Sequence, residues 1–206
     1  SDKDFANKAR EYVVKIQSAD SHCIGLWEKF INISLGHCQE VYDKLNVNLS
    51  DKDVKAESFY NDDLPKVIDE LDSSSMLTLS DGAKCVFLDG DDIPVIVQKA
   101  DGGYLYATTD LAALRYRAKV LGAKRISYVV DARQSQHFKQ VFAIAKKCGF
   151  VPQDVKLEHI AFGTMMDKSG KPFKTRDGGT VKLIDLLDEA IIKAKGAISN
   201  RDGFSQ

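Results

Sequence analysis

The chain has 206 residues, of which 44% are hydrophobic and 29% charged, and its formal net charge is −1. This length excludes a peptide hormone or a small disulfide scaffold, and the composition is typical of a globular protein rather than a disordered one. No apolar run reaches the roughly 18 residues of a membrane span, and residues 1–4 do not resemble a signal peptide. We therefore expect a cytoplasmic protein without a membrane partner.

The first part of the sequence predicts helices. Apolar residues recur at helical spacing from Phe5 to Ile16 and again from Cys23 to Leu45, which indicates two amphipathic helices. A short extended piece over 47–49 and a further helix over 64–71 follow. The three serines at 73–75 end that helix.

Two β-hairpins are expected next. The apolar stretches 76–79 and 85–88 flank a Ser-Asp-Gly-Ala turn, which is typical of a hairpin. A second hairpin would join 95–98 to 104–106 through Asp-Gly-Gly.

After the hairpins, strands and helices alternate. The pattern predicts a helix over 110–121, a strand over 125–130, a helix over 134–148, a strand over 157–162 and a last helix over 183–195. A β-α-β-α-β order with short connections implies a parallel sheet with right-handed crossovers.

Charge is distributed unevenly along the chain. Residues 39–92 hold 14 acidic and 5 basic side chains, whereas residues 115–176 hold 14 basic and 4 acidic ones. The basic segment could attract phosphate groups, or it could be an ordinary solvated surface. The four cysteines lie far apart without a Cys-x-x-Cys pair, so we expect reduced, buried thiols and no zinc site: Cys23, Cys38, Cys85 and Cys148.

Two polar clusters fall at predicted strand ends, where α/β sheets bind ligands. In the first, Tyr106 and Asp110 would share a helix face if the helix began one turn early; alternatively Thr108, Thr109 or Asp110 only caps the helix. In the second, Gln134 and His137 would project together from the next helix. The alternative there is that Asp131 is a cap and that His137 faces solvent.

The third cluster is a loop over 168–179 that contains three lysines, one arginine and three glycines. Such a cationic loop suits a triphosphate, although the loop lacks the spacing of a Walker motif and could be a solvated hairpin.

Three ordered segments, 101–117, 131–137 and 170–183, closely resemble bacterial arginyl-tRNA synthetases, which are class I aminoacyl-tRNA synthetases. The resemblance extends to 56–58 and 157–163, and so covers nearly the whole chain. It implies an α/β fold: the second half of a Rossmann-type parallel sheet with flanking helices, preceded by a mostly helical insertion with short β-hairpins. The implied organisation has an insertion region at 1–92, the half-sheet at 93–198 and a frayed tail at 199–206.

The resemblance also implies site residues. Glu57 and Asp110 would hold the guanidinium of the substrate arginine, and Tyr106 and Gln134 would complete that site. Carboxylates and an aromatic wall suit a planar cation with five donors. Two acids can hold the fork of arginine bidentately, which a lysine ammonium cannot match.

The nucleotide would lie near His137, with Phe162 and Gly163 offering backbone to adenine. Pro-Phe-Lys-Thr-Arg stands in place of the class landmark Lys-Met-Ser-Lys-Ser, which makes Lys174 and Arg176 the expected phosphate-binding residues, with Lys171 in reserve. The other landmark, His-x-Gly-His, is absent. ATP would act as a substrate with Mg²⁺, and no dedicated metal site or tightly bound cofactor is expected.

The parent protein implied by this resemblance is a monomeric arginine–tRNA ligase whose partners are L-arginine, ATP and tRNA(Arg). An isolated middle piece of such an enzyme would be inactive. Two alternatives are a stand-alone nucleotidyl transferase on the same half-fold and a non-catalytic module that binds arginine or RNA.

Overall fold

The structure is a computed structural model, and it describes residues 3–17, 20–91, 93–163, 166, 170 and 182–199. The chain divides into two compact units, one formed by Ser1–Val54 with Lys174–Gln206 and the other by Lys55–Phe173. The domain boundary expected at residue 92 concerns the parent protein and stays a prediction. Within the described ranges, no helix is both long and apolar enough to cross a bilayer.

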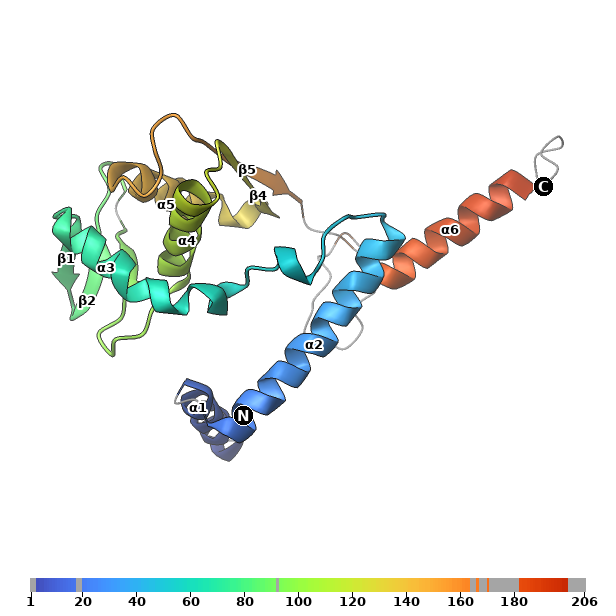
Figure 1. The fold of residues 1–206 in the computed structure, drawn as a ribbon, viewed down its shortest axis with the longest axis horizontal. Coiled ribbons are helices and arrows are strands. Elements are labelled where there is room, and N and C mark those ends of the chain that lie inside the picture. Colours follow the sequence, from blue (N-terminus) through green and yellow to red (C-terminus); the bar gives the residue numbers. More distant parts are fainter. Residues whose placement is uncertain are drawn as a thin grey trace. The chain divides into compact units, whose positions relative to one another are not determined.

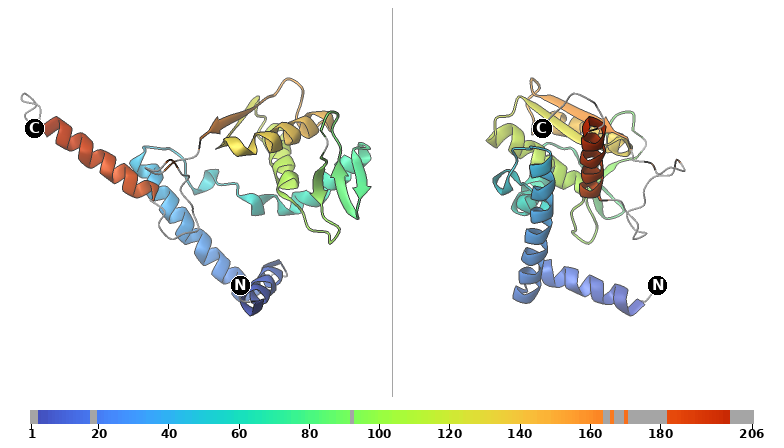
Figure 2. Two further views of the ribbon diagram at one scale, coloured as in Figure 1. Left: turned by 180° about the vertical axis from the view of Figure 1, so that it is seen from behind. Right: turned by 90° about the vertical axis from the view of Figure 1, so that its right-hand side faces the viewer.

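The first unit is helical, as the sequence predicts. It contains α1 (Lys3–Gln17), α2 (Ser21–Lys44), the short 3₁₀ helix η1 (Asp51–Asp53) and α6 (Leu183–Ser199). The chain changes direction between α1 and α2 (Figure 2). There the Asp20 carboxylate caps α2 by accepting the Cys23 N–H at 2.9 Å. An ion pair between Lys44 and Asp188 joins α2 to α6.

The second unit begins with the 3₁₀ helix η2 (Glu57–Asp63) and α3 (Leu64–Ser73) (Figure 1). A three-stranded antiparallel sheet follows, with β1 (Leu77–Ser80), β2 (Ala83–Val86) and β3 (Val95–Gln98) in that order. The first predicted hairpin is confirmed, because Ser80 pairs with Ala83 across its turn.

The rest of this unit contains the parallel strands. The elements are α4 (Tyr106–Arg115), the π-helical turn η3 (Tyr116–Val120), β4 (Arg125–Asp131), the 3₁₀ turn η4 (Ala132–Gln134), α5 (Ser135–Lys147) and β5 (Lys156–Phe162). β4 and β5 pair in parallel, in register from Arg125 opposite Lys156 to Asp131 opposite Phe162. Within the described residues the parallel sheet has these two strands, because β3 belongs to the antiparallel sheet.

The second predicted hairpin is wrong in its second strand. A single bridge joins Gln98 to Tyr104, and α4 begins two residues later. Leu105 is the extended residue before the helix, and its carbonyl accepts the Thr108 N–H at 2.9 Å. The predicted cap at Thr108, Thr109 or Asp110 is therefore wrong, and the helix begins one turn before Asp110.

Thr108 fixes this helix start against the sheet. Its side chain is fully buried, and its hydroxyl donates to the carbonyl of Val97 in β3. We expect Thr108→Val to lower the free energy of unfolding by about 1 to 2 kcal/mol, because the carbonyl then stays buried without a donor. Urea unfolding measures the change. Thr109→Val is the matched control; a loss of equal size there would contradict this role of Thr108.

The core of the second unit lies between α3, α4 and α5. Its fully buried side chains include Leu71, Leu111, Leu114, Ile144 and Phe150. Ile126 points from β4 into this core. The opposite face of the parallel pair is uncovered, because Val129 and Ile160 lie across from each other and are 63% and 46% exposed.

All four cysteines are free thiols, as predicted. Cys23 and Cys85 are buried, but the prediction of burial is wrong for the other two. Cys38 lies on an exposed side of α2, and Cys148 is half-buried at the end of α5. The described residues contain no cluster of side chains that could hold a metal ion.

Candidate functional site

Two predicted residues meet at the carboxyl end of β4. His137 lies in the first turn of α5, just after that strand, and Asp110 lies in the second turn of α4. The His137 Nε2 and the Asp110 Oδ2 are 2.7 Å apart, which is a hydrogen bond. The alternative interpretations, in which Asp110 is only a cap and His137 faces solvent, are therefore wrong. Both side chains remain partly exposed, at 25% and 30%, so a ligand can reach them.

Tyr106 precedes Asp110 in α4, and Gln134 precedes His137 at the junction of η4 and α5. Tyr106 is the first residue of α4, is 71% exposed, and lies one turn before Asp110 on the same face. Gln134 is exposed at the end of η4, three residues before His137. Asp131 caps this turn by accepting the Arg133 N–H at 2.8 Å, as one interpretation predicted.

Glu57 starts the 3₁₀ helix η2, which contacts α4. Its side chain is exposed and makes no hydrogen bond or ion pair with any other described residue. Side chains three positions apart eclipse each other in a 3₁₀ helix, so Glu57 shares a face with Tyr60. Tyr60 packs edge-on against Tyr116, with ring centroids 6.1 Å apart. The arrangement places Glu57 on the face of η2 that contains this buried tyrosine.

The sequence analysis does not identify three further residues near Asp110, which are Arg117, Tyr60 and Tyr128. The guanidinium of Arg117 lies 4.9 Å from the ring centroid of Tyr128, and the hydroxyls of Tyr60 and Tyr128 are buried without a hydrogen-bond partner in the described part of the chain. Burial raises the pKa of both tyrosines; the Arg117 charge opposes this shift and the Asp110 charge adds to it.

Helical spacing in the sequence could have identified Arg117 as a neighbour of Asp110. It lies seven residues after Asp110, which is close to two full turns of an α-helix, so the helix predicted over 110–121 would place both side chains on one face. The spacing of Tyr60 from Glu57 is a similar signal. Tyr128 carries no such signal, because its position follows from how β4 packs.

Besides His137, two of the predicted nucleotide residues belong to the described part of the chain. Phe162 and Gly163 are exposed at the carboxyl end of β5, and Phe162 is the register partner of Asp131. Lys171, Lys174 and Arg176 lie outside the described residues.

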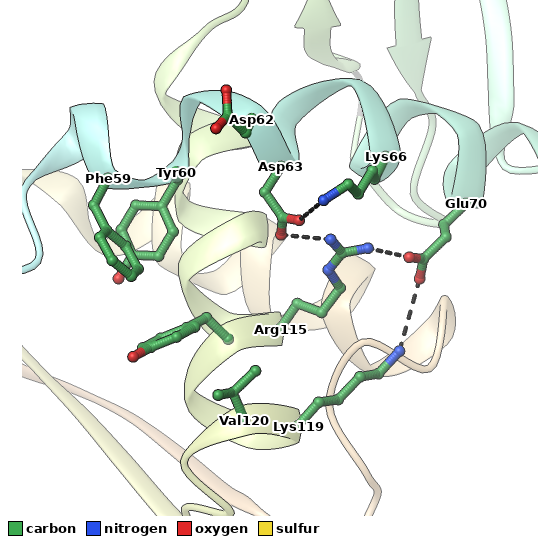
Figure 3. A pocket seen from close by; sticks show the side chains of 10 residues that line it. Phe59, Tyr60, Asp62, Asp63, Lys66, Glu70, Arg115, Lys119 and Val120 are labelled. Atoms are coloured by element: carbon green, nitrogen blue, oxygen red, sulfur yellow. Dashed lines mark hydrogen bonds and ion pairs between the residues drawn. The ribbon is translucent and has the colours of Figure 1, made fainter.

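A pocket of about 380 Å³ lies between η2, α3 and the end of α4 (Figure 3). Its lining combines aromatic and charged side chains, among them Phe59, Tyr60, Tyr116, Asp63, Glu70, Arg115 and Lys119. Arg115 is five residues after Asp110, which turns its side chain about 140° around the helix. Arg115 pairs with both Asp63 and Glu70, and Lys119 lies 3.7 Å from Glu70. Because these charges already pair with one another, we interpret the pocket as a structural contact between η2, α3 and the end of α4.

We expect Arg115→Ala to lower the free energy of unfolding by roughly 1.5 to 3 kcal/mol, because it leaves two carboxylates without their shared donor. Arg115 is only 11% exposed, which strengthens both pairs. Lys119→Ala is the control, because Lys119 is 48% exposed and such surface pairs contribute about 0 to 1 kcal/mol. Equal losses in the two variants would show that Arg115 has no special structural role.

Comparisons with known proteins show the family to which this sequence is similar. The family described as tRNA synthetases class I (R), catalytic domain, matches residues 1–204 of this chain. Two curated relatives are named arginine–tRNA ligase: one from Hahella chejuensis, 58% identical over 207 residues, and one from Pseudomonas paraeruginosa, 57% identical over 205 residues. The alignments cover 98% and 97% of this chain, and 36% and 35% of the relatives.

A crystal structure of arginyl-tRNA synthetase from Plasmodium falciparum is also similar. Its TM-score is 0.75 at 29% identity, and the match covers 97% of this chain and 34% of that one. The predicted resemblance and the α/β fold class are thereby confirmed. The chain spans about a third of the length of the relatives it matches.

Proposed function

This chain belongs to the catalytic-domain family of the arginine-specific class I tRNA synthetases, and we propose that it acts within a longer arginine–tRNA ligase. That enzyme would join L-arginine to ATP, form arginyl-adenylate and transfer the arginine to tRNA(Arg). The proposal extends to a cytoplasmic, monomeric parent protein.

The observation that carries the proposal is the convergence of Asp110 and His137 at the carboxyl end of a parallel strand. Ligands of open α/β sheets bind at this edge. The partly exposed carboxylate of Asp110 and the exposed ring of Tyr106 lie on one helix face, which suits a planar cation. Glu57 makes no hydrogen bond or ion pair within the described chain and is available as a second carboxylate.

The proposed chemistry is nucleophilic attack of the arginine carboxylate on the α-phosphorus of ATP, with release of pyrophosphate. Positioning and charge stabilisation supply the catalysis, so no nucleophilic side chain is required. Lys174 and Arg176 are the proposed partners of the phosphates, and Lys171 is a further candidate. Mg²⁺ would enter with ATP.

The uncovered face of the parallel pair supports a role within a larger domain. Val129, Ile160 and Phe162 are 63%, 46% and 52% exposed, and such adjacent apolar side chains are normally covered. We expect the isolated 206-residue chain to lack arginine-dependent ATP–pyrophosphate exchange, because part of the phosphate-binding machinery would lie elsewhere in the parent.

The test is to assay the full-length protein and the isolated chain side by side, with arginine, lysine and no amino acid. The proposal predicts arginine-dependent exchange and tRNA charging by the full-length protein only. Exchange by the isolated chain would favour a self-contained nucleotidyl transferase. Arginine binding without any exchange by the full-length protein would favour a non-catalytic module.

A further inference from the structure

The hydrogen bond between His137 and Asp110 joins two residues that are separated by 27 positions. Asp110 has two carboxylate oxygens, and the Nε2 of His137 engages one of them. A carboxylate held at one oxygen has fewer orientations available than a free one, so its other oxygen is pre-positioned for a ligand. The contact can therefore affect how Asp110 meets a cation.

The ring of His137 is itself held in place. It packs edge-on against Phe138, with centroids 5.1 Å apart and planes inclined by 76°. Phe138 is buried and packs in turn against Tyr128 and His159. His137 thus presents its Nε2 from a supported position rather than from a mobile surface side chain.

We infer that His137 is a positioning residue for arginine recognition: its Nε2–H fixes one oxygen of Asp110, and the other oxygen receives the guanidinium. The inference rests on the proposed function. The role differs from the nucleotide contact expected for His137 from the family resemblance, and the two make different kinetic predictions.

The experiment measures the KM for arginine and for ATP in the full-length enzyme at pH 8, for the wild type, His137→Ala and His137→Gln. Glutamine keeps a side-chain N–H donor, whereas alanine does not. We expect His137→Ala to raise the KM for arginine about tenfold at pH 8 and to change the KM for ATP less than about twofold. His137→Gln should stay near the wild type at pH 8.

The contrast between the two substrates and between the two variants separates positioning from simple structural support, because a general loss of structure would not raise the KM for arginine alone and would not depend on a side-chain N–H donor. His37→Gln, at an exposed position of α2, is the control and should follow the wild type.

An unchanged KM for arginine in His137→Ala would overturn the inference, as would a raised KM for ATP with an unchanged KM for arginine. If His137→Ala fails to fold, a KM for arginine in His137→Gln that is raised as far as about tenfold would overturn it instead, because that variant keeps the N–H donor. A wild-type enzyme that shows no arginine dependence would refute the proposed function itself. Normal wild-type activity with insensitive His137 variants would refute only the role of His137.

Discussion

Replacing Asp110 with asparagine in the full-length enzyme is expected to raise the KM for arginine by roughly 10- to 150-fold. The substitution keeps the shape of the side chain but removes the charge that would meet the guanidinium. A hydrogen bond to a charged group contributes about 1.5 to 3 kcal/mol, which corresponds to that range. Steady-state ATP–pyrophosphate exchange at varied arginine concentration measures the effect.

Two comparisons make this result specific. Asp89→Asn removes a fully exposed carboxylate from the same unit and should leave the KM for arginine unchanged. Asp110→Glu keeps the charge but moves it by one methylene group, so an intermediate KM is expected. Unchanged arginine kinetics in Asp110→Asn would remove this residue from the substrate site.

Replacing Arg176 or Lys174 with alanine is expected to lower the rate of adenylate formation by about 30- to 1,000-fold. Negative charge moves onto the leaving pyrophosphate in the transition state, and a cation that meets this charge stabilises the transition state more than the ground state. One such contact contributes roughly 2 to 4 kcal/mol. The loss should therefore appear in kcat more than in the KM for ATP.

Single-turnover measurement of arginyl-adenylate formation tests this prediction without interference from product release. Lys139→Ala removes an exposed cation from α5 and is the control for net charge. A raised KM for ATP at constant kcat would mean that the loop binds only the ground state. The absence of any effect from either substitution would make the loop an ordinary solvated hairpin.

The sequence predicts the periodic elements of this fold well. The apolar repeats of α1, α2, α3 and α5 are long enough to identify each helix, and the turn at 80–83 identifies the first hairpin. The start of α4 was not predictable in the same way. Tyr104, Leu105 and Tyr106 have strand-like propensity, and the buried contact of Thr108 with Val97 decides the local structure instead.

The candidate site, like the fold, is predictable from the sequence only in part. Spacing indicates that Tyr106 and Asp110 share a face only if the helix begins one turn before the predicted start at Asp110, and the structure meets this condition because α4 begins at Tyr106. Spacing could not predict the contact between Asp110 and His137, because that contact depends on how two helices pack around β4. The positions of Tyr60 and Tyr128 depend on packing in the same way, since no chain periodicity connects them to Asp110.

A crystal structure of the full-length enzyme with bound arginine tests the central claim most directly, because it locates the guanidinium. The account predicts guanidinium nitrogens about 2.7 to 2.9 Å from one carboxylate oxygen of Asp110, with His137 still bonded to the other oxygen. A guanidinium bound elsewhere, with no hydrogen bond to Asp110, would contradict it.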